Sequence, residues 1–215
     1  VKYLITADKS RIAEAAPIMA KVRNDRLNTS FGKLCQKLGH YQEAAQAFQR
    51  AHDLDTVVQL KLRHLDQVQG AFDLIRETSS AQGAQYVADY CMEVNDFRGA
   101  IEFLLIANKS DEAFKLAQSH GIVDQYAAVL GDTMCTEDAL KVAHYYEKLL
   151  DHGRAGKFYA MCGQFSRALK LFMQCGDREI PAAIDVVGKS ENETLTHTLL
   201  DFLIGETDGV PKDPN

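Results

Sequence analysis

Cysteine and histidine are the residue types in this chain that could act as nucleophiles, general bases or metal ligands. The five cysteines are Cys35, Cys91, Cys135, Cys162 and Cys175. No two of them form a Cys-x-x-Cys pair, which is a usual spacing of zinc ligands and redox-active thiols. Their odd number and wide spacing predict reduced thiols. Each occupies an apolar or small-residue position of the helical pattern described below, so we expect buried, unreactive side chains.

The histidines are dispersed along the chain. They are His40, His52, His64, His120, His144, His152 and His197. None has a second His or a Cys three or four residues further on, as a metal site on one helix face would need. We expect most of them at the surface or between helices, and we predict no metal ligand and no cofactor.

A glycine-rich run at residues 153–157 is the nearest approach to a phosphate-binding loop. Such a loop needs Gly-x-x-x-x-Gly-Lys followed by Ser or Thr after a strand, whereas Phe158 follows Lys157 here. We therefore interpret Gly156 as a point of close helix packing. No Gly-x-Gly-x-x-Gly or Gly-x-Ser-x-Gly motif occurs in the sequence, so we predict no catalytic residue.

Two pairs of tyrosines could stack a ligand between their rings. They are Tyr86 with Tyr90 and Tyr145 with Tyr146. In helical arrays, tyrosines more often fill the gaps between helices, and we favour that role. No small-molecule substrate is predicted.

Charge and hydropathy exclude two classes of partner. The formal net charge is −6, so the chain has no basic field that could neutralise nucleic-acid phosphates. The longest nearly uncharged apolar stretch, residues 100–107, contains Glu102 and is far too short to span a bilayer. We predict neither nucleic-acid binding nor direct membrane insertion.

The elements that must position these residues are helices. The chain has four prolines, and none of them lies within residues 18–180. A long stretch without proline, punctuated by single glycines, favours consecutive helices over a loop-rich β-sandwich.

An internal repeat supports this interpretation. An aromatic residue, Ala three later, a large apolar residue four later and a small residue three later recur in three places: Tyr41-Ala44-Phe48-Ala51, Phe97-Ala100-Leu104-Ala107 and Phe165-Ala168-Phe172-Cys175. This spacing forms one stripe along an α-helix. Each stripe begins two residues after an expected helix end, at Gly39, Asn95 or Gly163.

The helix before each stripe carries small residues that would let two helices cross closely. They lie in Phe31-Gly32 with Cys35, Val87-Ala88 with Cys91, and Ala155-Gly156 with Tyr159. Partial copies fill the intervals at Val68-Ala71-Ile75, Ala113-Ala117 and His152-Ala155-Tyr159. Because the copies are unevenly spaced, we predict an all-α fold that is an irregular α-solenoid.

The periodicity and helix-end signals predict thirteen helices. Their ranges are 27–38, 41–51, 54–64, 66–77, 81–94, 97–107, 110–120, 123–130, 136–150, 153–162, 165–175, 179–188 and 191–204. Pro17 interrupts a further helical pattern at residues 13–22. We expect a helix start at Thr136, a capping box from Ser190 to Glu193, and helix ends at glycines. These glycines are Gly39, Gly121, Gly163, Gly188 and Gly205. The helix at 97–107 is apolar nearly all round, so we expect neighbours on more than one side.

The paired pattern resembles the tetratricopeptide repeat (TPR), with units near residues 25–58, 81–114 and 149–182. Longer stretches resemble the TPR-like C-terminal region of subunits of intraflagellar transport complex A. These stretches are residues 76–78, 83–84, 97–104, 111–118, 156–158, 162–170 and 205–213. The resemblance runs from about Arg26 to the end of the sequence.

The resemblance implies a non-enzymatic scaffold within a longer protein that carries WD40 propellers before the solenoid. It implies roles in retrograde ciliary transport and in the import of membrane proteins into cilia. It also implies other complex A subunits as partners, and a location in the cilium or flagellum, the basal body and the cytoplasm. The resemblance carries over no catalytic residue and assigns no partner-contacting residue.

Two alternatives stay open from sequence: a solenoid segment of a vesicle-coat subunit, and an all-α enzyme or ligand-binding domain using a cavity near Tyr86, Tyr90 and Tyr145. We predict three segments. Residues 1–25 end a preceding helical unit, 26–205 form the TPR-like solenoid, and 206–215 link to the next repeat.

Overall fold

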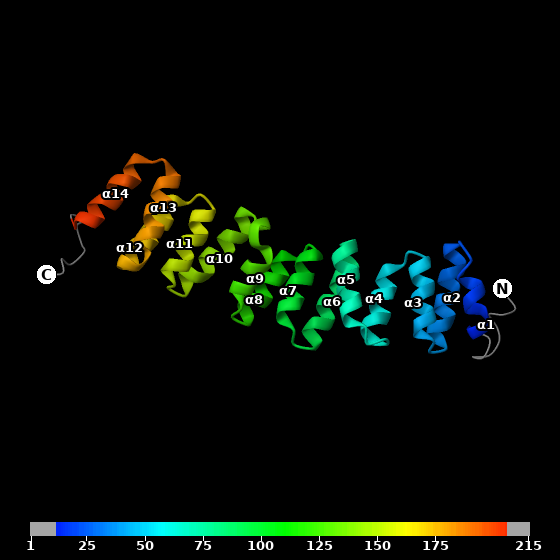
Figure 1. The fold of residues 1–215 in the computed structure, drawn as a ribbon. Coiled ribbons are helices and arrows are strands. Elements are labelled where there is room, and N and C mark those ends of the chain that lie inside the picture. Colours follow the sequence, from blue (N-terminus) through cyan, green and yellow to red (C-terminus); the bar gives the residue numbers. More distant parts are fainter. Residues whose placement is uncertain (1–11, 206–215) are drawn as a thin grey trace. The chain divides into compact units, whose positions relative to one another are not determined.

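The computed structural model describes residues 12–205, and all regular structure in this range is helical (Figure 1). It contains fourteen α-helices and two short 3-10 turns, with no strand among the described residues. The helix pairs with the most extensive contacts are one or two places apart along the chain, as in a solenoid. The predicted all-α, irregular solenoid is confirmed.

The helices fall into two compact units, whose boundary lies between Tyr126 and Ala127. The first unit holds α1 (Ile12–Met19), α2 (Asp25–Lys37), α3 (Tyr41–Arg50), α4 (Leu54–Arg63), α5 (Val68–Thr78), α6 (Ala81–Glu93), α7 (Phe97–Ile106) and α8 (Ser110–Ser119). The boundary falls within α9 (Val123–Leu130). The second unit holds η2 (Gly131–Thr133), α10 (Thr136–Lys148), α11 (His152–Met161), α12 (Phe165–Gln174), η3 (Gly176–Glu179), α13 (Ile180–Ser190) and α14 (Glu193–Ile204).

The thirteen predicted helices are all present, with ends within two residues of the predicted ones. The helix expected around Pro17 is α1, which contains that proline. Ile12 and Met19 of α1 pack in one core cluster with Phe31 and Ala47. The predicted division at residue 25 stays a prediction, and residues 1–11 and 206–215 lie outside the described part of the chain.

The repeated stripes form the core of both units. Their central Ala and large apolar residues are nearly fully buried, and these are Ala44, Phe48, Ala100, Leu104, Ala168 and Phe172. The partial copies are equally buried at Ala71, Ile75, Ala113, Ala117, Ala155 and Tyr159. The periodicity thus identified the sides on which neighbouring helices meet.

The small residues of the preceding helices face the large residues of the stripes. A Cβ added at Gly32 would lie 3.0 Å from the Phe48 ring, and one at Gly156 would lie 2.7 Å from the Phe172 ring. Sixteen residues separate the glycine from the aromatic ring in both pairs. Each pair joins the two helices of one antiparallel unit, α2 with α3 and α11 with α12.

The apolar helix α7 has neighbours on several sides, as predicted. It packs against α6 and α8, and Phe103 contacts Phe72 of α5 with ring centroids 4.8 Å apart. Phe103 and Ile101 are completely buried although they do not belong to the repeated stripe.

Some predicted helix-end signals are confirmed and others need correction. The helix α10 begins at Thr136 as predicted, and Cys135 caps it, because its sulfur accepts a hydrogen bond from the Asp138 amide. Asn192 caps α14 through the Thr194 amide, whereas the Ser190 hydroxyl donates to the Val187 carbonyl, so the capping box is wrong. Gly188 lies inside α13, since the left-handed residue that ends this helix is Glu191.

The other four glycines follow helices with positive φ, as expected. They are Gly39, Gly121, Gly163 and Gly205, with φ of 81°, 67°, 72° and 77°. Asn95 takes the same left-handed conformation before α7, with φ of 61°.

Candidate functional site

Cys35 and Cys91 are fully buried among the helix pairs. Burial raises the pKa of Cys35 to about 11 and that of Cys91 to about 12. Both side chains therefore stay as thiols at neutral pH, and the expected burial is confirmed at these two positions.

The expectation is wrong for Cys135, which is exposed at the start of α10. Its thiol donates to Asp138 Oδ2 at 3.1 Å, so the helix-capping role brings the sulfur to the surface. Cys162 and Cys175 are half-buried, and burial raises the pKa of both thiols.

Two histidines stack on aromatic side chains between helices. The ring centroids of Tyr41 and His64 are 4.0 Å apart, and those of Phe97 and His120 are 3.7 Å apart. In each pair the histidine follows the aromatic residue by 23 positions and terminates a helix. This recurring pair was not among the predicted features, although the repeated 23-residue interval is visible in the sequence. Among residues 12–205, no three His, Cys, Asp or Glu side chains gather as a metal ion would require.

The phosphate-loop interpretation fails on geometry as well as on sequence. The Asp151 carboxylate already accepts the Arg154 amide at 3.1 Å and caps the N-terminus of α11, where a phosphate would bind. A Cβ at Gly153 would lie 3.1 Å from Glu179 Oε1, so a second carboxylate adjoins the same turn. Both negative charges repel a phosphate, while Gly156 serves close helix packing as predicted.

The tyrosines contact neighbouring side chains. Buried Tyr146 stacks on Phe158 with centroids 5.9 Å apart, and the Arg154 guanidinium lies 5.0 Å from its ring centre. The Tyr86 hydroxyl accepts a hydrogen bond from Gln82 in the preceding turn of α6. The contacts of Tyr146 agree with the predicted packing role, whereas the Tyr86 contact lies within α6.

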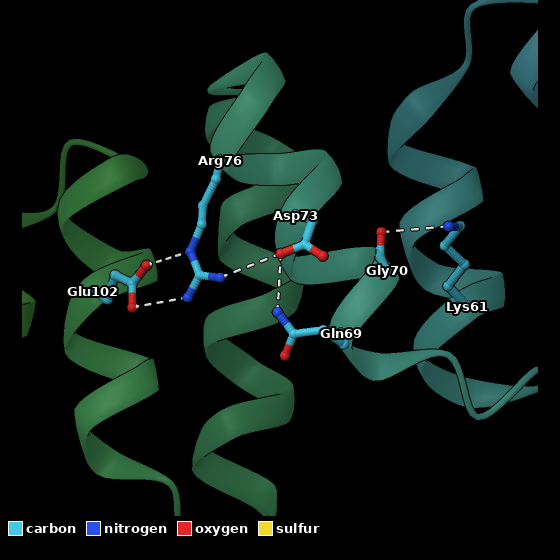
Figure 2. Close-up of polar contacts among 6 residues, drawn as sticks. All are labelled: Lys61, Gln69, Gly70, Asp73, Arg76 and Glu102. Atoms are coloured by element: carbon cyan, nitrogen blue, oxygen red, sulfur yellow. Dashed lines mark hydrogen bonds and ion pairs between the residues drawn. The ribbon is translucent and has the colours of Figure 1, made fainter.

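A polar network joins α5 to α7 in the first unit (Figure 2). Arg76 donates from Nε and Nη2 to the two oxygens of Glu102, at 2.7 and 3.2 Å, and from Nη1 to Asp73 at 3.4 Å. Its guanidinium carbon also lies 5.6 Å from the centre of the Phe103 ring. All three guanidinium nitrogens of Arg76 are thus used within the chain, and we assign this side chain to helix packing.

A second network joins α10, α11 and α12 in the second unit. The hydroxyl of fully buried Tyr159 donates to Glu147 Oε2 at 2.6 Å. Arg167 donates to the same carboxylate from Nη2, at 3.0 Å to Oε1 and 2.8 Å to Oε2. The Tyr159 hydrogen bond, followed by the Arg167 bonds and charge, lowers the pKa of Glu147. Burial and the same carboxylate raise the pKa of Tyr159.

The second network borders an open cleft of about 440 Å³ on α12. Its lining consists of Glu147 from α10 and of Ser166, Arg167, Lys170, Leu171 and Gln174 from α12. The α12 residues recur at intervals of three to four, so they share one helix face. Unlike Arg76, Arg167 engages the carboxylate through one nitrogen only. The cleft is therefore polar, and Nε and Nη1 of Arg167 have no hydrogen-bond partner among the described residues.

The comparison with protein families bears on the whole helical region. The model of the IFT140/IFT172 TPR domain matches residues 8–204. The chain belongs to this family. Membership of the family agrees with the paired helices and with the resemblance seen in the sequence.

Comparison with individual proteins supports the same family. The chain is 37% identical over 206 residues to WD repeat-containing protein 19 of Mus musculus and equally to that of Homo sapiens. It is 33% identical over 204 residues to WD repeat-containing protein dyf-2 of Caenorhabditis elegans. Each alignment covers 94% of this chain but only 15% of the relative. The chain thus spans about one seventh of the length of these relatives.

A shorter match links the chain to a protein named for its transport role. It is 30% identical over 89 residues, 40% of the chain, to intraflagellar transport protein 122 homolog of Xenopus tropicalis. Within the described residues, no helix has both the length and the apolar content needed to cross a bilayer.

Proposed function

We propose that this chain is a non-enzymatic protein-interaction scaffold, the TPR-like segment of an intraflagellar transport complex A subunit. The observation that carries the proposal is the family match over residues 8–204, together with 37% identity to WD repeat-containing protein 19 over 94% of the chain. In the larger protein, the segment would act in retrograde ciliary transport and in the import of membrane proteins into cilia.

The packing of the chain supports a scaffold. The side chains of the repeated stripes and of the Arg76 network make contacts between helices. Stacked helix pairs leave long outer faces on which a partner can dock, and each pair can change its outward residues without disturbing its neighbours. Such faces favour extended protein partners over a small substrate.

We propose other complex A subunits as the partners, and the cilium or flagellum, the basal body and the cytoplasm as the location. The name of the Xenopus relative supports the transport assignment, since it describes an intraflagellar transport protein.

Affinity capture tests the proposal in the full-length protein. A variant lacking residues 26–205 should lose complex A subunits that the intact protein captures, and it should fail to restore ciliary return transport in cells without the native protein. Capture of an unchanged set of subunits by the deletion variant, with normal return transport, would contradict the proposal. A second variant replaces the segment with an unrelated solenoid of equal length. If this variant also loses the subunits, the segment acts through its binding faces and not only as a spacer.

A further inference from the structure

The lining of the α12 cleft combines two cations with a single carboxylate. Glu147 is its one carboxylate, and both oxygens of that carboxylate are occupied by Arg167 and by the Tyr159 hydroxyl. Arg167 and Lys170 are the two cations in the lining. The cleft therefore has a net positive charge in a chain whose formal net charge is −6.

Some of the donors of these cations have no hydrogen-bond partner in the described part of the chain. Within the described residues, Arg167 donates hydrogen bonds through Nη2 alone, and its guanidinium carbon lies 4.4 Å from the centre of the Tyr159 ring. Its Nε and Nη1 therefore remain as donors for a ligand that approaches at the edge of the guanidinium. Lys170 is exposed and has no ion pair there, because its neighbours one turn away on α12 are Ser166 and Gln174. Lys189 in the same unit shows the contrasting case, with Asp185 one turn away at 2.7 Å.

The rest of the lining complements a peptide. Ser166 and Gln174 place hydroxyl and amide groups one turn before and one turn after Lys170. Leu171, only 6% exposed, gives the cleft an apolar floor. A cleft of this kind offers charge-assisted hydrogen bonds over apolar contact area, as specific protein contacts do.

We propose that the α12 cleft docks an acidic segment of a partner protein, with two carboxylates bound by Arg167 and Lys170. The proposal rests on the scaffold function above and assigns it a contact site. Residues three apart on a helix lie about 5–6 Å apart, so carboxylates at a similar spacing on the partner would reach both cations. The overall negative charge of the chain disfavours a long nucleic acid here, since such a polyanion would meet repulsion outside the cleft.

Site-specific photo-crosslinking in the full-length protein tests the site. A benzophenone amino acid at Gln174, used in the assembled complex, should cross-link to a partner peptide with at least two Asp or Glu residues within one helical turn. Lys170→Glu should lower the yield of that product about tenfold, because it places like charges opposite each other. Lys157→Glu, a change at an exposed lysine of α11 outside this lining, is the matched control and should leave the yield unchanged.

Lys170→Gln removes the charge without adding repulsion, and an intermediate yield is expected. The helical circular dichroism of each variant should match that of the parent, since Lys170 is exposed. Cross-linking to an apolar or basic segment, cross-linking to no protein, or equal yields from Lys170→Glu and Lys157→Glu would each overturn the proposal. If transport subunits still co-purify in those cases, the scaffold function stands and the site assignment fails.

Discussion

At the scale of single residues, the shape of a few small side chains decides how closely the helices approach. Gly156 lets the Phe172 ring lie against the backbone of α11, and Gly32 does the same for Phe48 on α2. Gly188 has no atom within 4 Å of an added Cβ. The same residue type is thus required at one site and costs helix stability at the other.

Gly156→Ala should lower the free energy of unfolding by about 1–2 kcal/mol. Its Cβ would lie 2.7 Å from the Phe172 ring, and overpacking costs about 1–3 kcal/mol, offset by a helix-propensity gain of about 0.5–1 kcal/mol. Gly188→Ala is the matched control and should gain about 0.5–1 kcal/mol. Urea unfolding followed by circular dichroism measures both, and equal effects at the two glycines would contradict the packing role.

Glu147 should make the second unit sensitive to acid. Its pKa is lowered from 4.5 in the folded chain, so the folded state binds fewer protons than the unfolded state in this range. The stabilisation is present above about pH 4.5 and disappears as the pH falls through the lowered pKa. Glu147→Gln should therefore lose less stability than the parent between about pH 5.5 and pH 3.

Tyr159→Phe is the companion variant for this pH dependence. It keeps the buried ring but removes the hydrogen bond that contributes most to the lowered pKa of Glu147. Its loss of stability on acidification should fall between those of the parent and Glu147→Gln. Denaturant midpoints measured across this pH range distinguish the three chains, and parallel profiles would contradict the assigned role of Glu147.

At the scale of the elements, left-handed residues end the helices and allow the next one to turn back. Gly163 after α11 and Asn95 after α6 suit this conformation, because glycine and asparagine tolerate positive φ. Leu150 after α10 has φ of 59° and is 74% exposed. A leucine there is strained and leaves apolar surface in water.

Leu150→Gly should raise the free energy of unfolding by about 0.5–1 kcal/mol. Relief of the left-handed strain is worth about 1–2 kcal/mol, and the added freedom of glycine in the unfolded chain removes part of it. Gly163→Leu at the equivalent turn is the reverse test and should destabilise by a similar amount, since Gly163 has φ of 72°. Thermal unfolding measures the pair, and a loss of stability in Leu150→Gly would show that the exposed leucine makes a needed contact.

At the scale of the whole molecule, the chain consists of two units whose helices contact mainly their near neighbours. Stability in such arrays is approximately a sum over repeats and the interfaces between adjacent repeats. Damage in one unit is therefore expected to remain local.

Phe172→Ala should increase amide hydrogen exchange in α11 and α12 while leaving α2 and α3 protected. Removing a buried phenylalanine costs roughly 3–5 kcal/mol, and the contacts of α12 are with α11, α13, α14 and η3. Phe48→Ala, the equivalent change in the first unit, should show the opposite distribution. Loss of protection throughout residues 12–205 in either variant would show that the chain unfolds as one cooperative unit.

Local patterns in the amino-acid sequence were enough to predict the helices, their stripes and the family. Apolar periodicity reports directly on the buried face of a helix, so Phe48, Leu104 and Phe172 could be placed in the core beforehand. Glycine and asparagine reveal turns through backbone preference, so Gly39, Asn95 and Gly163 were recognised as helix ends. Where such local preferences compete, as between Ser190 and Asn192, the sequence did not identify the capping residue.

Which side chains of separate helices meet could not be predicted without the three-dimensional packing. The Glu147–Tyr159–Arg167 network, the stacking of Tyr41 on His64 and the exposure of Cys135 depend on helix crossings. The sequence likewise does not show how Arg167 is used. In the structure its Nη2 donates to Glu147, while Nε and Nη1 have no hydrogen-bond partner among the described residues. Periodicity fixes which face of a helix is buried. The distances between polar groups on different helices are fixed by packing in three dimensions.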